Sequence, residues 1–293
     1  MNKTCIICNN SDVEFTLEHI IPFSLGNNNF SLKNVCKKCN SLIGEKIDVH
    51  STNNIMAELM RMVKRVPGHS GKIPFPFAKG KTEDGFNVKL SLDMKPQIES
   101  KVSKKENEYK IVAGSHDEVI AIAEKILKRK GKPPLSEFDK QSILSKAAHK
   151  EHPIINYSFE LNINMLKLET IKIVFETVVY KLGTSCLQDA AVKQLQDVIF
   201  KYIYEDALEI EFLNENVSSL DGAAFNSIRD SLHSTFQEDI FHIIHFTVRE
   251  KDTVASVAIE GMLPMAVKLN TVNLIKNNSL ITIGYPNNFF LNE

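Results

Sequence analysis

Two pairs of cysteines dominate the first 39 residues of this 293-residue chain. Cys5 and Cys8 form one C-x-x-C pair, Cys36 and Cys39 form the other, and 27 residues lie between the pairs. Each two-residue gap lets a pair of thiolates grip a metal ion from one tight turn, and four thiolates suit tetrahedral Zn²⁺. A segment this rich in Asn and turn-forming residues has too little apolar surface to fold without such a metal. We therefore predict a structural zinc site.

The overall composition is that of an ordinary folded protein, with 43% hydrophobic and 24% charged residues. No apolar run approaches the roughly 20 residues that span a bilayer, and the N-terminus lacks the apolar segment of a signal peptide. These features predict a cytoplasmic protein without a membrane partner. Because disulfides are rare in a reducing cytosol, metal binding is the favoured interpretation of the cysteine pairs. The formal net charge of −1 requires any nucleic-acid surface to be local.

The interval between the two cysteine pairs carries the sequence Leu-Glu-His-Ile-Ile-Pro, with Glu18 beside His19. Strand twist at this position can bring both side chains toward a metal ion and its bound phosphate. Asn40 follows Cys39 directly, so a zinc knuckle would fix its place in the first turn of a helix. A carboxylate and a carboxamide oxygen are hard ligands that suit Mg²⁺ or Mn²⁺ rather than zinc. Glu18 and Asn40 are therefore candidate ligands of a second, catalytic metal.

In order and spacing, these motifs resemble the zinc-containing branch of the HNH endonuclease family over residues 5–48. The resemblance implies a ββα-metal fold whose four cysteines hold a structural zinc. The first histidine of the family motif is the general base, which corresponds to His19. The residue before it and the last motif residue bind the catalytic metal, which correspond to Glu18 and Asn40. The middle asparagine, here Asn34, braces the loop that presents the histidine, and the products end in 5′-phosphate and 3′-hydroxyl.

Two further positions bear on this resemblance. Some relatives carry another metal ligand four residues after the last motif residue, where this chain has Gly44. Water and substrate oxygens would then complete the metal shell. Lys37 and Lys38, between the cysteines of the second pair, are the best-placed basic residues for contact with a phosphate backbone.

The remainder of the chain mixes helical and strand patterns, which predicts an α+β fold. We expect an HNH module over residues 1–66 and a mixed α+β accessory domain over residues 67–293, for substrate selection, dimerisation or sensing. Residues 71–85 have the composition of a loop or linker. The periodicities predict helices over 35–48, 54–66, 116–130, 168–182 and 190–204, and strands over 88–94, 109–112, 240–248, 254–259 and 265–269.

Two functions stay open from the sequence. The first is a metal-dependent endonuclease acting on DNA, with RNA as an alternative substrate, a homodimer as an option and restriction or phage defence as the setting. The second is a zinc-stabilised nucleic-acid-binding protein that does not cleave. The pair Glu18 and His19 favours the enzyme, because a protein that only binds has no need of an acid beside the base.

Overall fold

The computed structural model describes the whole chain except residues 1–2, 28, 92, 107, 149–153, 236–239, 272–273, 276, 286–289 and 293. The fold is α+β, as predicted, and it divides into two compact units. One unit joins Met1–Pro74 to Glu160–Glu293, and the other is Phe75–Phe159. The residues after 159 therefore fold together with the cysteine-rich segment. The boundary expected after residue 66 stays a prediction about how function is divided along the chain.

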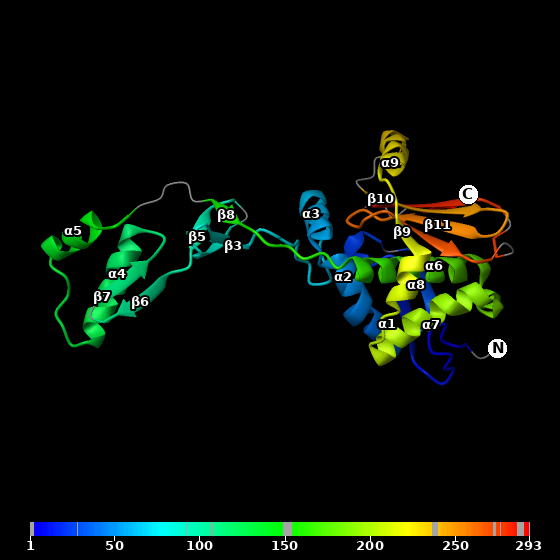
Figure 1. Cartoon of the computed structure of the whole chain (residues 1–293), viewed down its shortest axis with the longest axis horizontal. Helices are drawn as coiled ribbons and strands as arrows, with labels where there is room; N and C mark the ends of the chain where they lie inside the picture. The colour runs from blue at the N-terminus through cyan, green and yellow to red at the C-terminus, as the bar shows by residue number, and fades with distance from the viewer. Residues whose placement is uncertain are drawn as a thin grey trace. The chain divides into compact units, whose positions relative to one another are not determined.

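The N-terminal part of the first unit is an antiparallel hairpin followed by a helix (Figure 1). Strands β1 (Phe15–His19) and β2 (Ser31–Cys36) form the hairpin, and a short 3-10 turn, η1 (Phe23–Leu25), lies in the connection. The helix then runs as α1 (Lys37–Ile43), a π-helical turn η2 (Gly44–Asp48) and α2 (Val49–Thr52). This is the ββα order that the sequence predicted. Turns of π-helix within an α-helix often mark functional sites.

Helix α3 (Ile55–Lys64) follows, as expected over 54–66. The side chain of Asn54 accepts hydrogen bonds from the backbone N–H groups of Met56 and Ala57. Asn is among the preferred N-cap residues because its oxygen satisfies N–H groups that have no partner inside the helix. The sequence therefore specifies where this helix begins.

Two long helices from the second half of the chain complete the first unit. Helix α6 (Ile163–Leu182) contacts β2, η2 and α2 as well as α7 (Ala190–Glu205), and α7 in turn contacts α1. Most of α6 is buried from Met165 to Val179, on all sides. A helix that is apolar all round belongs in the interior of a protein, and α6 holds that place here.

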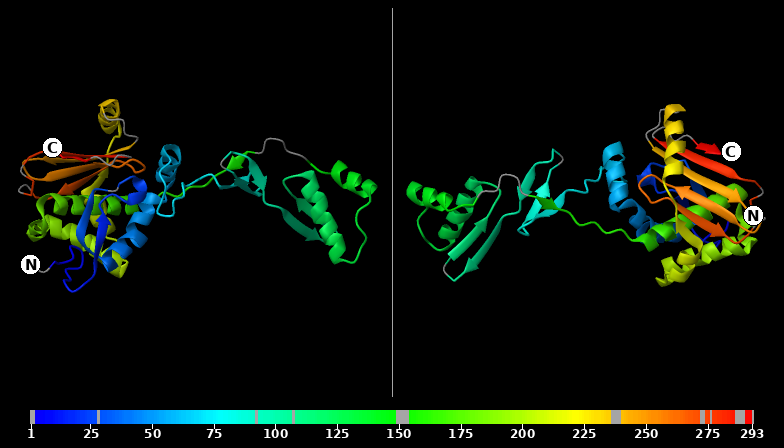
Figure 2. Two further views of the ribbon diagram at one scale, coloured as in Figure 1. Left: turned by 180° about the vertical axis from the view of Figure 1, so that it is seen from behind. Right: turned by 45° about the horizontal axis from the view of Figure 1, so that its top comes forward.

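A six-stranded antiparallel sheet lies over α6 (Figures 1 and 2). Its strand order is β14-β13-β10-β11-β12-β9. The strands predicted over 240–248, 254–259 and 265–269 are β10, β11 and β12. The bounds are β9 (Val217–Ser219), β10 (Ile240–Val248), β11 (Thr253–Ala258), β12 (Met265–Leu269), β13 (Ser279–Tyr285) and β14 (Phe290–Asn292), with η3 (Thr184–Gln188), α8 (Ile210–Asn216) and α9 (Ala223–Thr235) between α6 and β10.

One buried histidine fastens this sheet to the hairpin connection. His242 on β10 is fully buried; its Nε2 lies 2.9 Å from the Leu25 carbonyl oxygen, and its Nδ1 accepts a hydrogen bond from the Glu260 backbone N–H. Burial lowers the pKa of His242 to about 3, so the ring stays neutral. Both ring nitrogens are used in structural hydrogen bonds.

The second unit, Phe75–Phe159, contains a small four-stranded sheet in the order β5-β4-β3-β8. Strand β3 (Lys79–Thr82) lies in the stretch predicted to be a loop, so that prediction was wrong. Gly80 explains the error, because a Cβ there would lie 2.6 Å from the Ile155 side chain and 2.9 Å from that of Tyr157. The glycine that suggested a loop allows neighbouring strands to approach closely.

The other elements of the second unit are the remaining strands of this sheet, a hairpin and two helices. Helix α5 begins with the expected capping box of Ser136 and Asp139. The bounds are β4 (Asn87–Leu90), β5 (Pro96–Ile98), β6 (Lys101–Lys105), β7 (Glu108–Val112), α4 (His116–Arg129), α5 (Glu137–Ser145) and β8 (Ile155–Asn156). In the described part of the chain, no helix is both long enough and apolar enough to cross a bilayer.

Candidate functional site

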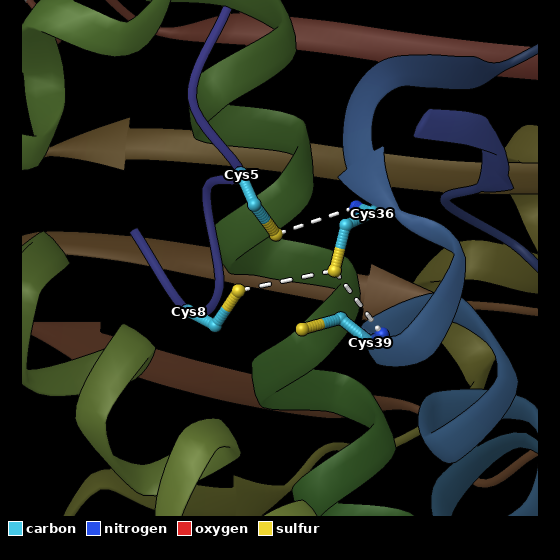
Figure 3. A group of neighbouring side chains, drawn as sticks. All are labelled: Cys5, Cys8, Cys36 and Cys39. Atoms are coloured by element: carbon cyan, nitrogen blue, oxygen red, sulfur yellow. Dashed lines mark hydrogen bonds between the residues drawn. The ribbon is translucent and has the colours of Figure 1, made fainter. Parts of the chain in front are cut away.

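The four N-terminal cysteines converge on one point (Figure 3). The sulfurs of Cys5, Cys8, Cys36 and Cys39 all lie within 4.8 Å of one another. The distance between Cys8 Sγ and Cys36 Sγ is 3.8 Å. Four Zn–S bonds of about 2.3 Å in a tetrahedron would give sulfur separations of about 3.8 Å. The two pairs therefore meet, as predicted, in an arrangement that suits a tetrahedral metal.

Backbone groups prepare these sulfurs to act as thiolates. The N–H of Cys36 donates to Cys5 Sγ at 3.3 Å, and the N–H of Cys39 donates to Cys36 Sγ at 3.4 Å. A hydrogen bond from the Cys39 side chain, with help from backbone N–H groups, lowers the pKa of Cys5 to about 4 against the opposing effect of burial. Since the thiolate is the form that binds metals, the cluster can load near neutral pH.

Helix α7 covers the cysteine cluster from the far end of the sequence. The Tyr204 hydroxyl lies 3.2 Å from Cys39 Sγ. Gln196 donates from Nε2 to the Ile6 carbonyl oxygen at 2.6 Å and to Asn9 Oδ1 at 3.2 Å. Partners of this kind orient the ligands of a metal site. Nothing in the sequence pattern of residues 190–204 beyond helical periodicity pointed to this contact.

The end of β1 presents Glu18 and His19 on opposite sides of the strand, because side chains alternate along a strand. The pairing of β1 with β2 is irregular between Thr16 and Glu18. At this irregularity Asn40 Nδ2 donates to the Leu17 carbonyl oxygen at 2.8 Å, which ties α1 to the strand. Bulges of this type re-aim side chains and are common beside active sites.

His19 is partly buried and sits in an aromatic surrounding. Its ring lies 5.9 Å, centroid to centroid, from Phe23, and Phe23 stacks on the exposed His69 at 4.8 Å. Burial, followed by the nearby charges of Lys172 and His69, lowers the pKa of His19 below its usual value. The imidazole is therefore neutral at pH 7 and able to accept a proton. His69 could not be found from the sequence, because its position in a Pro-Gly loop gives no signal.

Glu18 points inward, toward a buried lysine on α6. The side chain of Glu18 is 3% exposed, and its Oε1 lies 3.4 Å from Lys172 Nζ. The same ammonium donates to the carbonyl oxygens of His19 at 3.1 Å and Ile20 at 3.3 Å, and to Asp48 Oδ1 at 3.0 Å. Lys172 thus joins the end of β1 to the helix that carries Asp48.

Burial of Glu18 raises its pKa to about 7, although the Lys172 charge opposes the shift. For Lys172 itself, burial disfavours the ammonium, but the surrounding carboxylates, Asp48 most of all, raise its pKa well above the usual value. Lys172 is therefore charged at every physiological pH, and Glu18 gains and loses its proton near neutrality.

Two more carboxylates of α6, Glu169 and Glu176, face the same ammonium. Their oxygens lie 3.8 and 3.7 Å from Lys172 Nζ, and no described hydrogen-bond donor reaches any of them. Both side chains are fully buried, and burial raises both pKa values well above the usual range despite the Lys172 charge. One lysine thus serves four acidic groups, since Glu18 and Asp48 are the other two.

Glu176→Gln is expected to stabilise the protein at pH 8 and to change little at pH 5. Burial holds the pKa of Glu176 in the folded protein well above the value of 4.5 expected for the unfolded chain. The wild type therefore loses stability as the pH rises from that value toward the folded-state pKa, by about 1.4 kcal/mol per pH unit. The glutamine variant has no such loss. Melting temperatures of both proteins between pH 5 and 8 measure the effect.

The exposed Glu205 at the end of α7 supplies the control, because Glu205→Gln removes a solvated carboxylate. We expect no growth of its melting-temperature difference with pH. A difference for Glu176→Gln that stays constant across this range would contradict the raised pKa.

The asparagines of the motif take distinct positions. Asn40 commits its Nδ2 to Leu17, which leaves Oδ1 as the atom available to a cation. Asn34 on β2 accepts a hydrogen bond from the Ile6 N–H at its backbone carbonyl, and its buried side-chain Oδ1 has no described hydrogen-bond partner. A Cβ on Gly44 would meet nothing within 4 Å, so open space lies beside the helix there. Carboxylate and amide oxygens at this strand end fit a hard divalent ion.

Lys37 and Lys38 are both exposed at the start of α1. Lys37 forms an ion pair with Glu14 at 3.0 Å, and Lys38 Nζ lies 4.9 Å from the centre of the Tyr204 ring. Exposed pairs of this kind contribute little to stability, so both ammonium groups can turn to another anion. Their contact with nucleic acid stays a prediction.

Residues 5–56 match the family model described as HNH endonuclease. This segment is an HNH endonuclease domain. The match covers a little under a fifth of the chain and extends the resemblance from residue 48 to the start of α3. No curated protein and no solved structure matches the chain. A nuclease-type activity on nucleic acid follows from the HNH domain, whereas α6 and α7, which touch its catalytic strand and its cysteines, lie outside the match.

Proposed function

We propose that this protein is a metal-dependent HNH endonuclease that hydrolyses the phosphodiester bonds of DNA, with His19 as the general base. The observation that carries the proposal is the neutral, partly buried imidazole of His19 at the strand end, between Glu18 on one side and the Asn40 anchor on the other. A base must be unprotonated at the working pH, and burial keeps His19 in that form.

The residues divide the chemistry as follows. Glu18 and Asn40 would hold Mg²⁺ or Mn²⁺, which supplies a Lewis acid for the scissile phosphate and its departing oxygen. His19 takes a proton from water, the water oxygen bonds to phosphorus, and the bond to the 3′ oxygen breaks. The products are a 5′-phosphate and a 3′-hydroxyl. Lys172 lies nearest to Glu18 Oε1, so Oε2 is the oxygen left for the metal.

Other parts of the proposal follow from the same residues. Zn²⁺ is the metal that best suits four thiolates, and it would hold the hairpin and α1 together. Lys37 and Lys38 would contact the phosphate backbone. The resemblance adds RNA as an alternative substrate, a homodimer, a cytoplasmic location and a role in restriction or phage defence; each of these stays a prediction.

His19→Ala is expected to lower the cleavage rate by about 10²- to 10⁴-fold, the usual contribution of a positioned general base. The assay follows plasmid and oligonucleotide cleavage with mapped ends, with and without added Mg²⁺ or Mn²⁺. His50→Ala, on α2 of the same domain, is the matched control and should keep wild-type cleavage. Cleavage at the wild-type rate by a folded His19→Ala protein would overturn the assignment of the base.

A second candidate is a zinc-stabilised protein that binds nucleic acid without cutting it. Two observations favour it: Glu18 already pairs with Lys172, and Gly44 offers the catalytic metal no ligand. This alternative predicts retardation of DNA on gels with no strand scission in Mg²⁺, Mn²⁺ or Ni²⁺. The mapped-end assay separates it from the nuclease.

A further inference from the structure

A groove with a volume of about 610 Å³ runs over the small sheet of the second unit, and three lysines line it. Lys79 and Lys81 lie on β3, and Lys89 lies on the neighbouring strand β4. All three side chains are exposed, while the alternate residues Thr82 and Val88 are buried. Because side chains alternate across a strand, the three ammonium groups share one face of the sheet.

The arrangement of these lysines works against the stability of the sheet. Lys79 and Lys89 are direct cross-strand partners, and like charges placed opposite one another on a sheet are destabilising. Glu99 pairs with Lys89 at 2.9 Å, but in the described part of the chain neither Lys79 nor Lys81 has an ion pair. The groove therefore carries an uncompensated positive charge, which fold stability alone does not explain.

The rest of the lining consists mainly of neutral hydrogen-bonding groups. Asn87 and Asn156 are the cross-strand partners of Lys81 on its two sides, and Tyr157 and Ser158 follow directly after β8. Glu99 is the single carboxylate in the lining. Ammonium groups flanked by amides recognise the phosphate oxygens of a polyanion without reading the bases, which is the way that proteins fix their register on DNA.

We propose that this groove is a docking site for the phosphate backbone of duplex DNA, separate from the residues of the HNH domain. The inference rests on the proposed function, since a DNA nuclease supplies the reason for a polyanion. It assigns a task to residues 75–159, which the HNH family match does not cover. Lys79 and Lys81 make the principal contacts, and Glu99 weakens the site.

The test measures binding of a labelled DNA duplex to the full chain by fluorescence anisotropy, without added divalent cation, from 50 to 300 mM salt. Each lost phosphate contact lowers the slope of log affinity against log salt by about 0.9, so Lys79→Ala/Lys81→Ala should lower it by about 2. The same relation predicts a loss of affinity of roughly 50-fold at 0.1 M salt. Glu99→Gln should bind more tightly than the wild type.

The matched control is Lys101→Ala/Lys105→Ala, which removes two exposed lysines from β6 of the same unit. Equal losses for the two double variants would overturn the groove as a specific site, as would an unchanged affinity of Lys79→Ala/Lys81→Ala together with Glu99→Gln. A loss confined to an RNA duplex would overturn the assignment to DNA. If the wild type binds DNA without cutting it, the proposed nuclease fails while these affinities still decide the groove.

Discussion

Cys39→Ser is expected to unfold the HNH domain at temperatures where the wild type is stable. Structural zinc in small domains contributes an apparent 10–16 kcal/mol, which exceeds the roughly 5–15 kcal/mol that stabilises a typical native protein. Residues 5–39 depend on this metal, because their cysteines are the point at which the first turn, β2 and α1 meet. Far-ultraviolet circular dichroism on heating, together with the zinc content of the purified protein, measures the loss.

The fifth cysteine provides the matched control for this prediction. Cys186 is also buried but lies in η3, outside the cysteine cluster. We expect Cys186→Ser to retain one bound metal and a melting temperature within a few degrees of the wild type. A Cys39→Ser protein that melts at the wild-type temperature would contradict a structural role for the metal.

Hydrogen exchange should reveal how far the unfolding spreads. Tyr204 contacts Cys39, and Gln196 holds the turn around Ile6. Because these contacts lose their partners, we expect faster exchange in α7 as well as in the hairpin. In the second unit, residues 75–159, exchange should stay as in the wild type.

The HNH domain was predictable because its information is local. The spacing of Cys5, Cys8, Cys36 and Cys39 fixes where the chain must return, and the motif around Glu18 and His19 fixes what lies between. Helices α6 and α7 were equally accessible from their periodicity, and the strands β10 to β12 from their apolar runs. Each of these elements repeats one pattern over several turns or residues.

Lys172 was not predictable, because its partners are far away in the sequence. It was visible only as a charge that interrupts the apolar run 171–179, with Glu176 four residues later. A lysine and a glutamate at this spacing on a helix usually form a solvated surface pair. The signal that they are buried lies in the apolar residues on every side of α6, which leave the helix no solvent-facing stripe.

Short elements were missed for a different physical reason. Strands β9 and β14 have three residues each, and β3 contains a glycine in its centre. Neighbouring strands and not local propensity determine such pieces, and β-propensity depends strongly on that context. Asp48 was likewise overlooked, although it lies within the recognised motif, since its role requires a lysine on another helix.

Lys172→Met is expected to destabilise the folded protein by about 3–5 kcal/mol, the usual effect of removing one partner of a buried ion pair. The substitution leaves four acidic groups around an apolar side chain, and the carbonyl oxygens of His19 and Ile20 lose their donor. Urea unfolding at pH 7 measures the change. Lys167→Met on the same helix is the control, because Lys167 makes only a surface hydrogen bond, to Asn214.

The pH dependence of this variant separates a buried cation from a mere loss of packing. Without the ammonium, the pKa values of Glu169, Glu176 and Glu18 rise further in the folded state, while those of the unfolded chain stay near 4.5. Raised folded-state pKa values of acids reduce stability as pH increases, so Lys172→Met should be most impaired at pH 8 and approach the wild type toward pH 5. A pH-independent deficit would contradict the charge-based explanation. Since the same ammonium fixes the carbonyl of His19, cleavage at pH 8 should fall even at temperatures where the variant is still folded.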